Sequence, residues 1–148
     1  MNLFSFLFKK KQPSTYKEDG TPNTSGELIA DLTDRANFVD GKQTWELAEE
    51  KKHDIEAMKH CCDAELNTMN KAGVVPAPYY FERVAILSRK LKNYEQEVFY
   101  CEMYIENVEA FYAKNGTKGM IDVRKGPRYQ AIVKRLPKAR ELYAKHRT

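Results

Sequence analysis

The sequence predicts an all-α fold, a small bundle of about four main helices that follows a flexible N-terminal segment. Apolar residues recur at intervals of three, four or seven in four stretches between residues 45 and 143, which is the spacing of one helix face. The gaps between these stretches carry helix-ending or helix-starting signals, such as Gly73 and the pair Gly126-Pro127. A chain of 148 residues has room for one such core.

Residues 1–26 form the predicted flexible segment and linker. From residue 12 onward they are Pro, Ser, Thr, Gly and Asn with scattered charge and no period. Residues 2–10 would place Leu and Phe side chains on one face if they were helical, and lysines end the stretch. This pattern suits contact with a membrane surface or with a groove of a partner, and it also suits packing on the chain's own surface.

The helical domain is expected to span residues 27–148. A short helix is predicted over Glu27–Arg35, because its apolar side chains lie three and four positions apart. The pair Asp40-Gly41 predicts a turn after this helix.

A longer helix is predicted over Trp45–Lys71, with Thr44 as its N-terminal cap. An apolar stripe runs along it from Trp45, and Gly73 marks its end. Prolines at positions 76 and 78 prevent the helix from continuing and favour a new start near Tyr79.

Two further helices, Tyr79–Leu91 and Glu95–Tyr112, are expected to form a hairpin across the turn Lys92-Asn93-Tyr94. Residues 79–112 resemble a tetratricopeptide repeat, a helix-turn-helix of about 34 residues. The matching positions are the aromatic Phe81, the pair Val84-Ala85, the turn aromatic Tyr94, and the apolar Val98 and Ile105. Glu97 and Tyr104 depart from the pattern, because they stand where that family has small alanines.

The resemblance implies an all-helical fold and a protein-binding role. A position 34 residues beyond Phe81 falls in a predicted loop at Asn115, so the sequence holds no second copy of the repeat. A single repeat must therefore use its neighbouring helices as caps, and we expect the Trp45 helix and the C-terminal helix to serve.

A last, basic helix is predicted over residues 127–147, with Pro127 at a first position where proline is tolerated. Pro137 removes a backbone hydrogen bond inside this helix. The apolar face stays in register across Pro137, so we expect a kink rather than a full break. Before this helix, Met120–Val123 allows a short extended piece.

Several classes of protein are excluded by the composition. No apolar run approaches the roughly 18–20 residues of a membrane span, so we expect no stable membrane insertion. The apolar start of the chain precedes its charges, whereas a signal peptide has its charges first. Three cysteines, two of them adjacent, are a poor disulfide framework and suit a reducing compartment. A cytoplasmic protein is expected.

The sequence predicts no catalytic residue, no metal site and no cofactor. Cys61 and Cys62 would point about 100° apart on a helix and cannot chelate as a Cys-x-x-Cys pair does. The Glu-x-x-His spacing of Glu50 and His53 lacks the second copy and the extra carboxylates that a di-iron site needs. No nucleophile motif or phosphate-binding loop is present. We expect a protein that is not an enzyme.

The leading functional prediction is a non-enzymatic adaptor or regulatory protein that binds a partner, or a second copy of itself, through the aromatic hairpin. Aromatic residues are too numerous there to face one small core, and tyrosine favours surfaces that are apolar on one side and wet on the other. The predicted interface residues are Tyr79, Tyr80, Tyr100, Tyr104 and Phe111. An alternative that stays open is the edge of a core with its hydroxyls in water.

The second prediction is a nucleic-acid-binding accessory protein, because positive charge collects at the C-terminal end. Residues 1–113 carry a net charge of −5, whereas residues 114–148 carry +9. Clustered cations bind phosphates and release counterions. The candidate residues are Arg124, Lys125, Arg128, Lys134, Arg135, Lys138 and Lys145. The open alternatives are a solvated helix face, or charge that complements the acidic stretch Glu46–Glu65.

Overall fold

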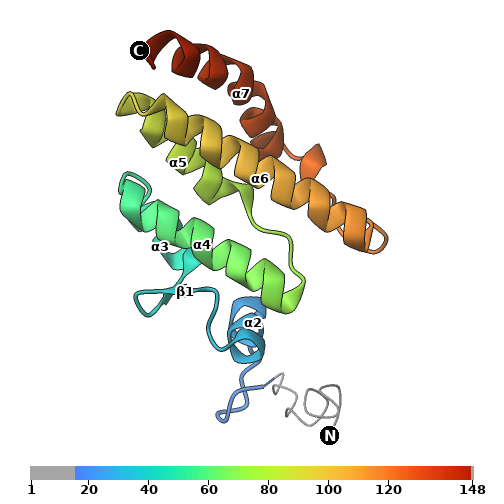
Figure 1. Ribbon diagram of the computed structural model, residues 1–148. Coiled ribbons are helices and arrows are strands. Elements are labelled where there is room, and N and C mark those ends of the chain that lie inside the picture. The colour runs from blue at the N-terminus through green and yellow to red at the C-terminus, as the bar shows by residue number, and fades with distance from the viewer. Residues whose placement is uncertain (1–15, 148) are drawn as a thin grey trace, which may run out of the picture.

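The structure, a computed structural model, describes residues 16–147 and confirms the all-α class (Figure 1). The predictions for residues 1–15 lie outside this part of the chain. In chain order the elements are α2 (Ser25–Thr33), β1 (Phe38–Val39), β2 (Lys42–Gln43), α3 (Thr44–Glu50), α4 (Ile55–Ala72), α5 (Pro78–Lys90), α6 (Tyr94–Asn115), the 3-10 helix η1 (Val123–Lys125) and α7 (Pro127–His146). None of the helices within residues 16–147 combines the length and the apolar composition that crossing a bilayer requires.

The first elements differ from the prediction by small amounts. α2 begins at Ser25, two residues earlier than predicted, because Thr24 caps it by accepting a hydrogen bond from the Glu27 N–H at 3.2 Å. The turn at Asp40-Gly41 is confirmed, and the two short strands pair antiparallel on either side of it.

The predicted single helix over Trp45–Lys71 is wrong, because the chain forms α3 and α4 there. The side chain of Asp54 accepts a hydrogen bond from the Ala57 N–H at 3.1 Å and so caps a new helix. An aspartate before an apolar residue favours this cap over the interior of a continuing helix. The apolar residues keep a helical spacing along the predicted stripe, but the helix itself is interrupted between α3 and α4.

The break between α3 and α4 changes which side chains are buried. Trp45, the first residue of the predicted stripe, is 64% exposed, whereas Leu47 is buried. The guanidinium of Arg83 on α5 donates two hydrogen bonds to the Lys52 carbonyl, at 2.9 and 2.7 Å. These bonds satisfy a carbonyl at the break and tie the α3–α4 connection to α5.

α5 and α7 run parallel and side by side. Arg128 on α7 pairs with Glu82 on α5 at 3.2 Å. Further along, Arg89 on α5 donates a hydrogen bond to the Arg135 carbonyl on α7 at 3.5 Å. Both contacts join residues 46 positions apart, so the two helices keep the same direction and register.

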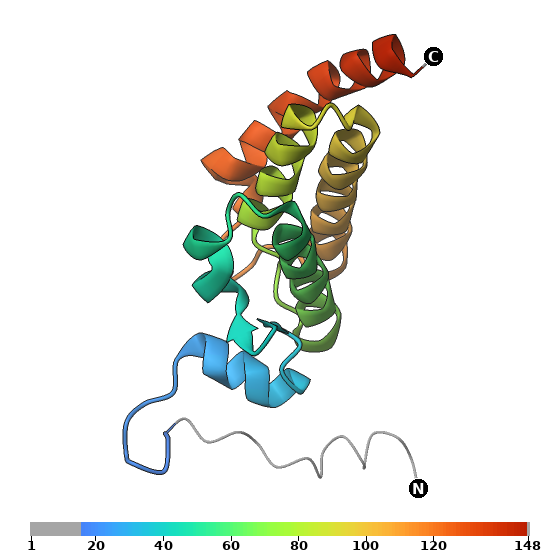
Figure 2. The same cartoon turned by 90° about the vertical axis from the view of Figure 1, so that its left-hand side faces the viewer.

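α4 and α6 also run parallel to each other, with corresponding ends close together. Met69 and Phe111 line one hollow near the C-terminal ends of both helices. In the N-terminal half of α6, Tyr100 lies close to Cys62 of α4. Figure 1 shows α4, the hairpin of α5 and α6, and α7 following one another through the molecule. Figure 2 shows α2 at one end of this stack and α7 at the other.

The core is centred on Tyr104 of α6. This side chain is fully buried, and its ring centroid lies 4.7 Å from that of Phe81 and 6.1 Å from that of Tyr129. Its hydroxyl donates a hydrogen bond to the Pro76 carbonyl at 2.8 Å. The central tyrosine therefore joins α5, α6, α7 and the segment that follows α4.

α7 is one helix that continues through Pro137, as the register of its apolar face predicted. Its buried residues are Tyr129, Ile132, Leu136 and Ala139. The segment before it contains the 3-10 helix η1, and Met120–Val123 forms no strand. Asp122 caps η1 by accepting a hydrogen bond from the Arg124 N–H at 3.0 Å.

Glu65 on α4 gives a pH dependence that can be measured. Burial raises the pKa of Glu65, although hydrogen bonds from the Ala77 N–H at 3.1 Å and the Thr44 hydroxyl at 2.9 Å oppose the shift. The folded state therefore holds this proton more tightly than the unfolded state. Its contribution to stability should fall as pH rises from about 4.5 through the raised pKa.

Urea denaturation of the wild type and of Glu65→Gln over this pH range tests the expectation. The free energy of unfolding of the wild type minus that of the variant should decrease as pH rises, because the variant has no carboxyl group to ionise. Other carboxylates cancel in the difference. A difference that does not change with pH would show that Glu65 titrates normally.

Candidate anion-binding groove

The predicted aromatic interface is divided between the core and the surface. Tyr80, Tyr104 and Phe111 are buried, with 4%, 0% and 6% of their surface exposed. The prediction that Tyr80, Tyr104 and Phe111 belong to a protein interface is therefore wrong, because other parts of the chain cover these three side chains. Tyr79 and Tyr100 are partly exposed, and the Tyr79 hydroxyl donates to the Ala48 carbonyl at 2.6 Å.

The exposed aromatic residue of α6 is Phe99, which the prediction did not select. It is 58% exposed, and its ring packs edge-on against Tyr100 at 5.6 Å. The buried stripe of α6 consists of Glu97, Cys101, Tyr104, Val108, Phe111 and Tyr112. The spacing of apolar residues on α6 is compatible with several buried stripes. The positions of the neighbouring helices decide which of these stripes is buried.

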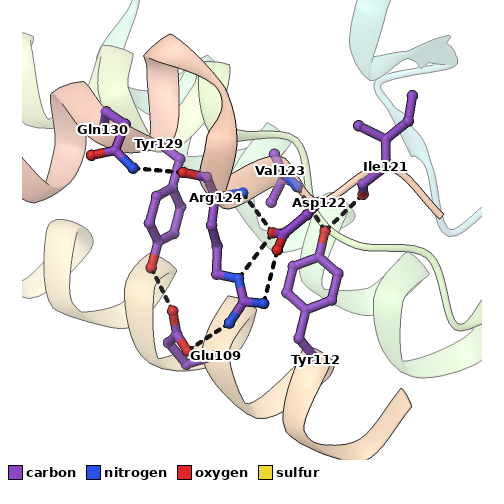
Figure 3. Close-up of polar contacts among 8 residues, drawn as sticks. All are labelled: Glu109, Tyr112, Ile121, Asp122, Val123, Arg124, Tyr129 and Gln130. Carbon is purple, nitrogen blue, oxygen red and sulfur yellow. Dashed lines mark hydrogen bonds and ion pairs between the residues drawn. The ribbon is translucent and has the colours of Figure 1, made fainter. Parts of the chain in front are cut away.

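Arg124, a predicted phosphate-binding residue, is held by the chain itself. Its guanidinium makes two hydrogen bonds of 2.9 Å to the Asp122 carboxylate and one of 3.0 Å to Glu109, and it lies over the Tyr112 ring at 4.5 Å (Figure 3). These bonds lower the pKa of Asp122 and raise that of Arg124. The Tyr129 hydroxyl donates to the other oxygen of Glu109 at 2.9 Å.

We call the residues Glu109, Tyr112, Asp122, Arg124 and Tyr129 the clamp. The Tyr112 hydroxyl accepts a hydrogen bond from the Val123 N–H at 2.9 Å and donates one to the Ile121 carbonyl at 3.0 Å. Gln130 donates to the Arg124 carbonyl at 2.6 Å. The clamp fixes η1 and the start of α7 against α6, so its role is structural.

Most other cations of α7 also pair with acidic residues of the chain. The pairs are Arg128 with Glu82, Arg135 with Glu97, Lys138 with Glu141, and Arg140 with Glu102. The acidic partners come from α5, α6 and α7 itself, and not from Glu46–Glu65, because α7 packs against α5 and α6. Within residues 16–147, Lys125, Lys134 and Lys145 have no ion pair.

A shallow, open groove of about 290 Å³ between α5 and α7 brings four cations together. Its lining residues are Glu82, Arg89, Ala131, Lys134, Arg135 and Lys138. Three of the cations were predicted from the basic C-terminal sequence, whereas Arg89 comes from α5. These cations cluster because α5 and α7 run parallel in a register that places Arg89 beside Arg135.

Beneath this groove lies a fully buried carboxylate, that of Glu97 on α6. It accepts hydrogen bonds from Arg89 Nε at 3.0 Å and from Arg135 Nη1 at 2.6 Å, and it forms an ion pair with Arg89 Nη2 at 2.8 Å. The side chains of Arg89 and Arg135 keep 32% and 22% of their surface exposed. One negative charge thus faces two positive charges, and the cluster keeps a net charge of +1.

The buried carboxylate also fixes the two guanidiniums in position. Arg89 Nη1, Arg135 Nε and Arg135 Nη2 make no hydrogen bond to any residue from 16 to 147, so donors remain for a ligand. A guanidinium held in place loses little side-chain entropy when it binds a second anion. The arrangement can therefore bind a carboxylate or phosphate oxygen in the groove.

Sequence reasoning missed the role of Glu97, although a signal was present. This residue stands where a tetratricopeptide repeat has a small alanine, and it lies on the same helical stripe as Cys101 and Tyr104. A charged residue on a buried stripe requires a partner of opposite charge. That reasoning predicts arginines on the facing helices but does not identify them.

The three cysteines are buried thiols of low reactivity. All three are buried, and burial raises the pKa of Cys61 and of Cys101 to about 12 and that of Cys62 further. Their thiols remain protonated at neutral pH and are poor nucleophiles. Within residues 16–147, no group of three or more His, Cys, Asp or Glu side chains is placed to hold a metal ion.

Comparison with known proteins adds no assignment: no protein-family model, curated protein or solved structure matches this chain. Its function must therefore be argued from its own residues.

Proposed function

We propose that this chain is a non-enzymatic cytoplasmic interaction protein that binds an acidic segment of a partner protein in the groove between α5 and α7. The observation that carries the proposal is the sharing of one buried carboxylate, that of Glu97, by Arg89 and Arg135. This sharing leaves a net positive charge beside the groove and guanidinium N–H donors that make no hydrogen bond within residues 16–147. Lys134, which has no ion pair among the described residues, adds a further cation to its lining.

The arrangement of the helices supports a protein partner. The hairpin of α5 and α6 resembles a tetratricopeptide repeat in sequence, and α4 and α7 cover its two sides as caps. Such helical stacks present grooves between parallel helices to extended segments of other proteins. The groove between α5 and α7 has this position, and an extended chain with Asp or Glu side chains suits its charge.

Nucleic acid is the second candidate ligand, and it is favoured by Lys125, Lys134 and Lys145, which make no ion pair in the part of the chain that the structure describes. Phosphate-backbone binding requires many uncompensated cations along a surface. Arg128, Lys138 and Arg140 each pair with a carboxylate of their own, and Glu82 lines the groove. The charge pattern therefore favours a short acidic segment over a nucleic-acid backbone.

Charge reversal at Lys134 tests the proposal. A labelled peptide rich in Asp and Glu should bind the wild type, as measured by fluorescence anisotropy at low salt. Lys134→Glu should weaken binding by about tenfold, because it replaces an attraction in the groove with a repulsion. Lys145→Glu is the matched control, since it makes the same charge change on the same helix outside the groove.

The possible outcomes separate the candidate functions. Equal weakening by both variants would mean that net charge alone attracts the peptide, which contradicts a groove. A single-stranded oligonucleotide that binds more tightly than the peptide, with a steep salt dependence, would replace the protein partner with nucleic acid. Absence of binding by both ligands at low salt would reject both.

A further inference from the structure

The loop between α6 and η1 exposes two adjacent apolar side chains. Ile121 is 90% exposed, the highest fraction of any large apolar residue between 16 and 147, and Met120 is 42% exposed. We call this pair the apolar tip. A single exposed apolar residue is ordinary, but an almost fully exposed isoleucine beside a methionine leaves apolar surface that the described chain does not cover.

The backbone at the apolar tip is held in place. The Ile121 carbonyl and the Val123 N–H are both hydrogen-bonded to the Tyr112 hydroxyl, and Asp122 between them is bound by Arg124. The Met120 N–H donates to the Thr117 carbonyl at 3.1 Å. Figure 3 shows the Ile121 side chain directed away from the clamp. The clamp therefore presents this side chain to the outside on a fixed support.

Unpaired positive charge flanks the apolar tip in the chain. Lys114, Lys118 and Lys125 are exposed and have no ion pair within residues 16–147. The neighbouring acids, Glu109 and Asp122, already bind Arg124. Apolar side chains at the end of a loop with lysines on both sides combine the two attractions that hold a protein on an anionic lipid surface.

We propose that the apolar tip is a reversible membrane-surface contact that inserts Ile121 and Met120 among the headgroups of an anionic bilayer. A lipid surface accepts a protruding side chain without a matching pocket, and each lysine near it strengthens binding by about fivefold. The sequence LFSFLFKKK at residues 3–11 has the same chemistry but lies outside the described residues. This contact is distinct from the groove between α5 and α7.

Vesicle co-sedimentation with the full-length chain tests the contact. Vesicles of phosphatidylcholine with one third phosphatidylglycerol should bind the wild type, and pure phosphatidylcholine should bind it several-fold less. Ile121→Glu should weaken binding to the anionic vesicles by at least about tenfold, through loss of apolar contact and added repulsion. Leu91→Glu is the matched control, because Leu91 is 65% exposed and the change in charge is identical.

The outcomes are decisive in both directions. Loss of binding in Ile121→Glu but not in Leu91→Glu supports the contact. Equal binding of Ile121→Glu and the wild type would assign any vesicle binding to another segment, such as residues 3–11, and would overturn the proposal. Absence of wild-type binding would also overturn it, and so would equal losses in the two variants. The peptide-binding assay on Lys134→Glu is unaffected by any of these results.

Discussion

Replacing Tyr104 with alanine is expected to lower the free energy of unfolding by about 4 kcal/mol. The side chain is fully buried between Phe81 and Tyr129, so its removal leaves a cavity that three packed helices cannot close. It also removes the only side-chain hydrogen bond that the Pro76 carbonyl makes to residues 16–147. Urea denaturation monitored by circular dichroism measures the change.

Two companion variants separate the contributions at Tyr104. Tyr104→Phe should lose about 1–2 kcal/mol, because it keeps the ring but leaves the buried Pro76 carbonyl unpaired. Phe99→Ala should change stability by about 0.5 kcal/mol or less, because this neighbouring aromatic on α6 is 58% exposed. A Tyr104→Ala protein as stable as Phe99→Ala would mean that Tyr104 is not in the core.

Replacing Glu97 with alanine is expected to lower the free energy of unfolding by about 3 kcal/mol. The change leaves Arg89 and Arg135 close together without the carboxylate that they share. The loss is placed at the lower end of the range for a broken buried pair, because both guanidiniums are partly exposed and can regain water. The midpoint of urea denaturation should shift with little change in its slope.

Glu102→Ala provides the control for Glu97→Ala. Glu102 also lies on α6 and also pairs with an arginine of α7, Arg140 at 3.1 Å, but both side chains are substantially exposed. Its loss should cost about 0.5 kcal/mol or less. Similar losses in the two variants would show that burial of the carboxylate adds nothing to its stabilising effect. That result would contradict the statement that Glu97 fixes the two guanidiniums.

The sequence predicted the helices where local signals and apolar period agreed. The turn at Lys92-Asn93 and the prolines at positions 76 and 78 placed the hairpin to within a few residues. The break before α4 was missed because the apolar stripe continues across it, although Asp54 before Ile55 is a helix-start signal. A periodic pattern of apolar residues shows that a helix face is apolar, but it does not show that one unbroken helix carries the whole face.

The candidate site was predicted only in part, for a different physical reason. Three of the groove cations, Lys134, Arg135 and Lys138, belong to the basic stretch that composition identified. Arg89 was not linked to them, because it lies 46 residues from Arg135 and only the parallel packing of α5 and α7 brings the two together. Contacts between helices also decide which cations of α7 form ion pairs with acidic side chains.

The position of Glu97 has a consequence for partial unfolding. Arg89 belongs to the same hairpin as Glu97, whereas Arg135 belongs to α7. If α7 detaches, the buried carboxylate keeps one guanidinium and is not left without a counter-charge. Detachment of the last helix would expose the apolar face formed by Tyr129, Ile132 and Leu136, but it would not leave an isolated carboxylate. One half of the groove belongs to this helix, so an anion that bridges Arg89 and Arg135 would also stabilise the chain against its detachment.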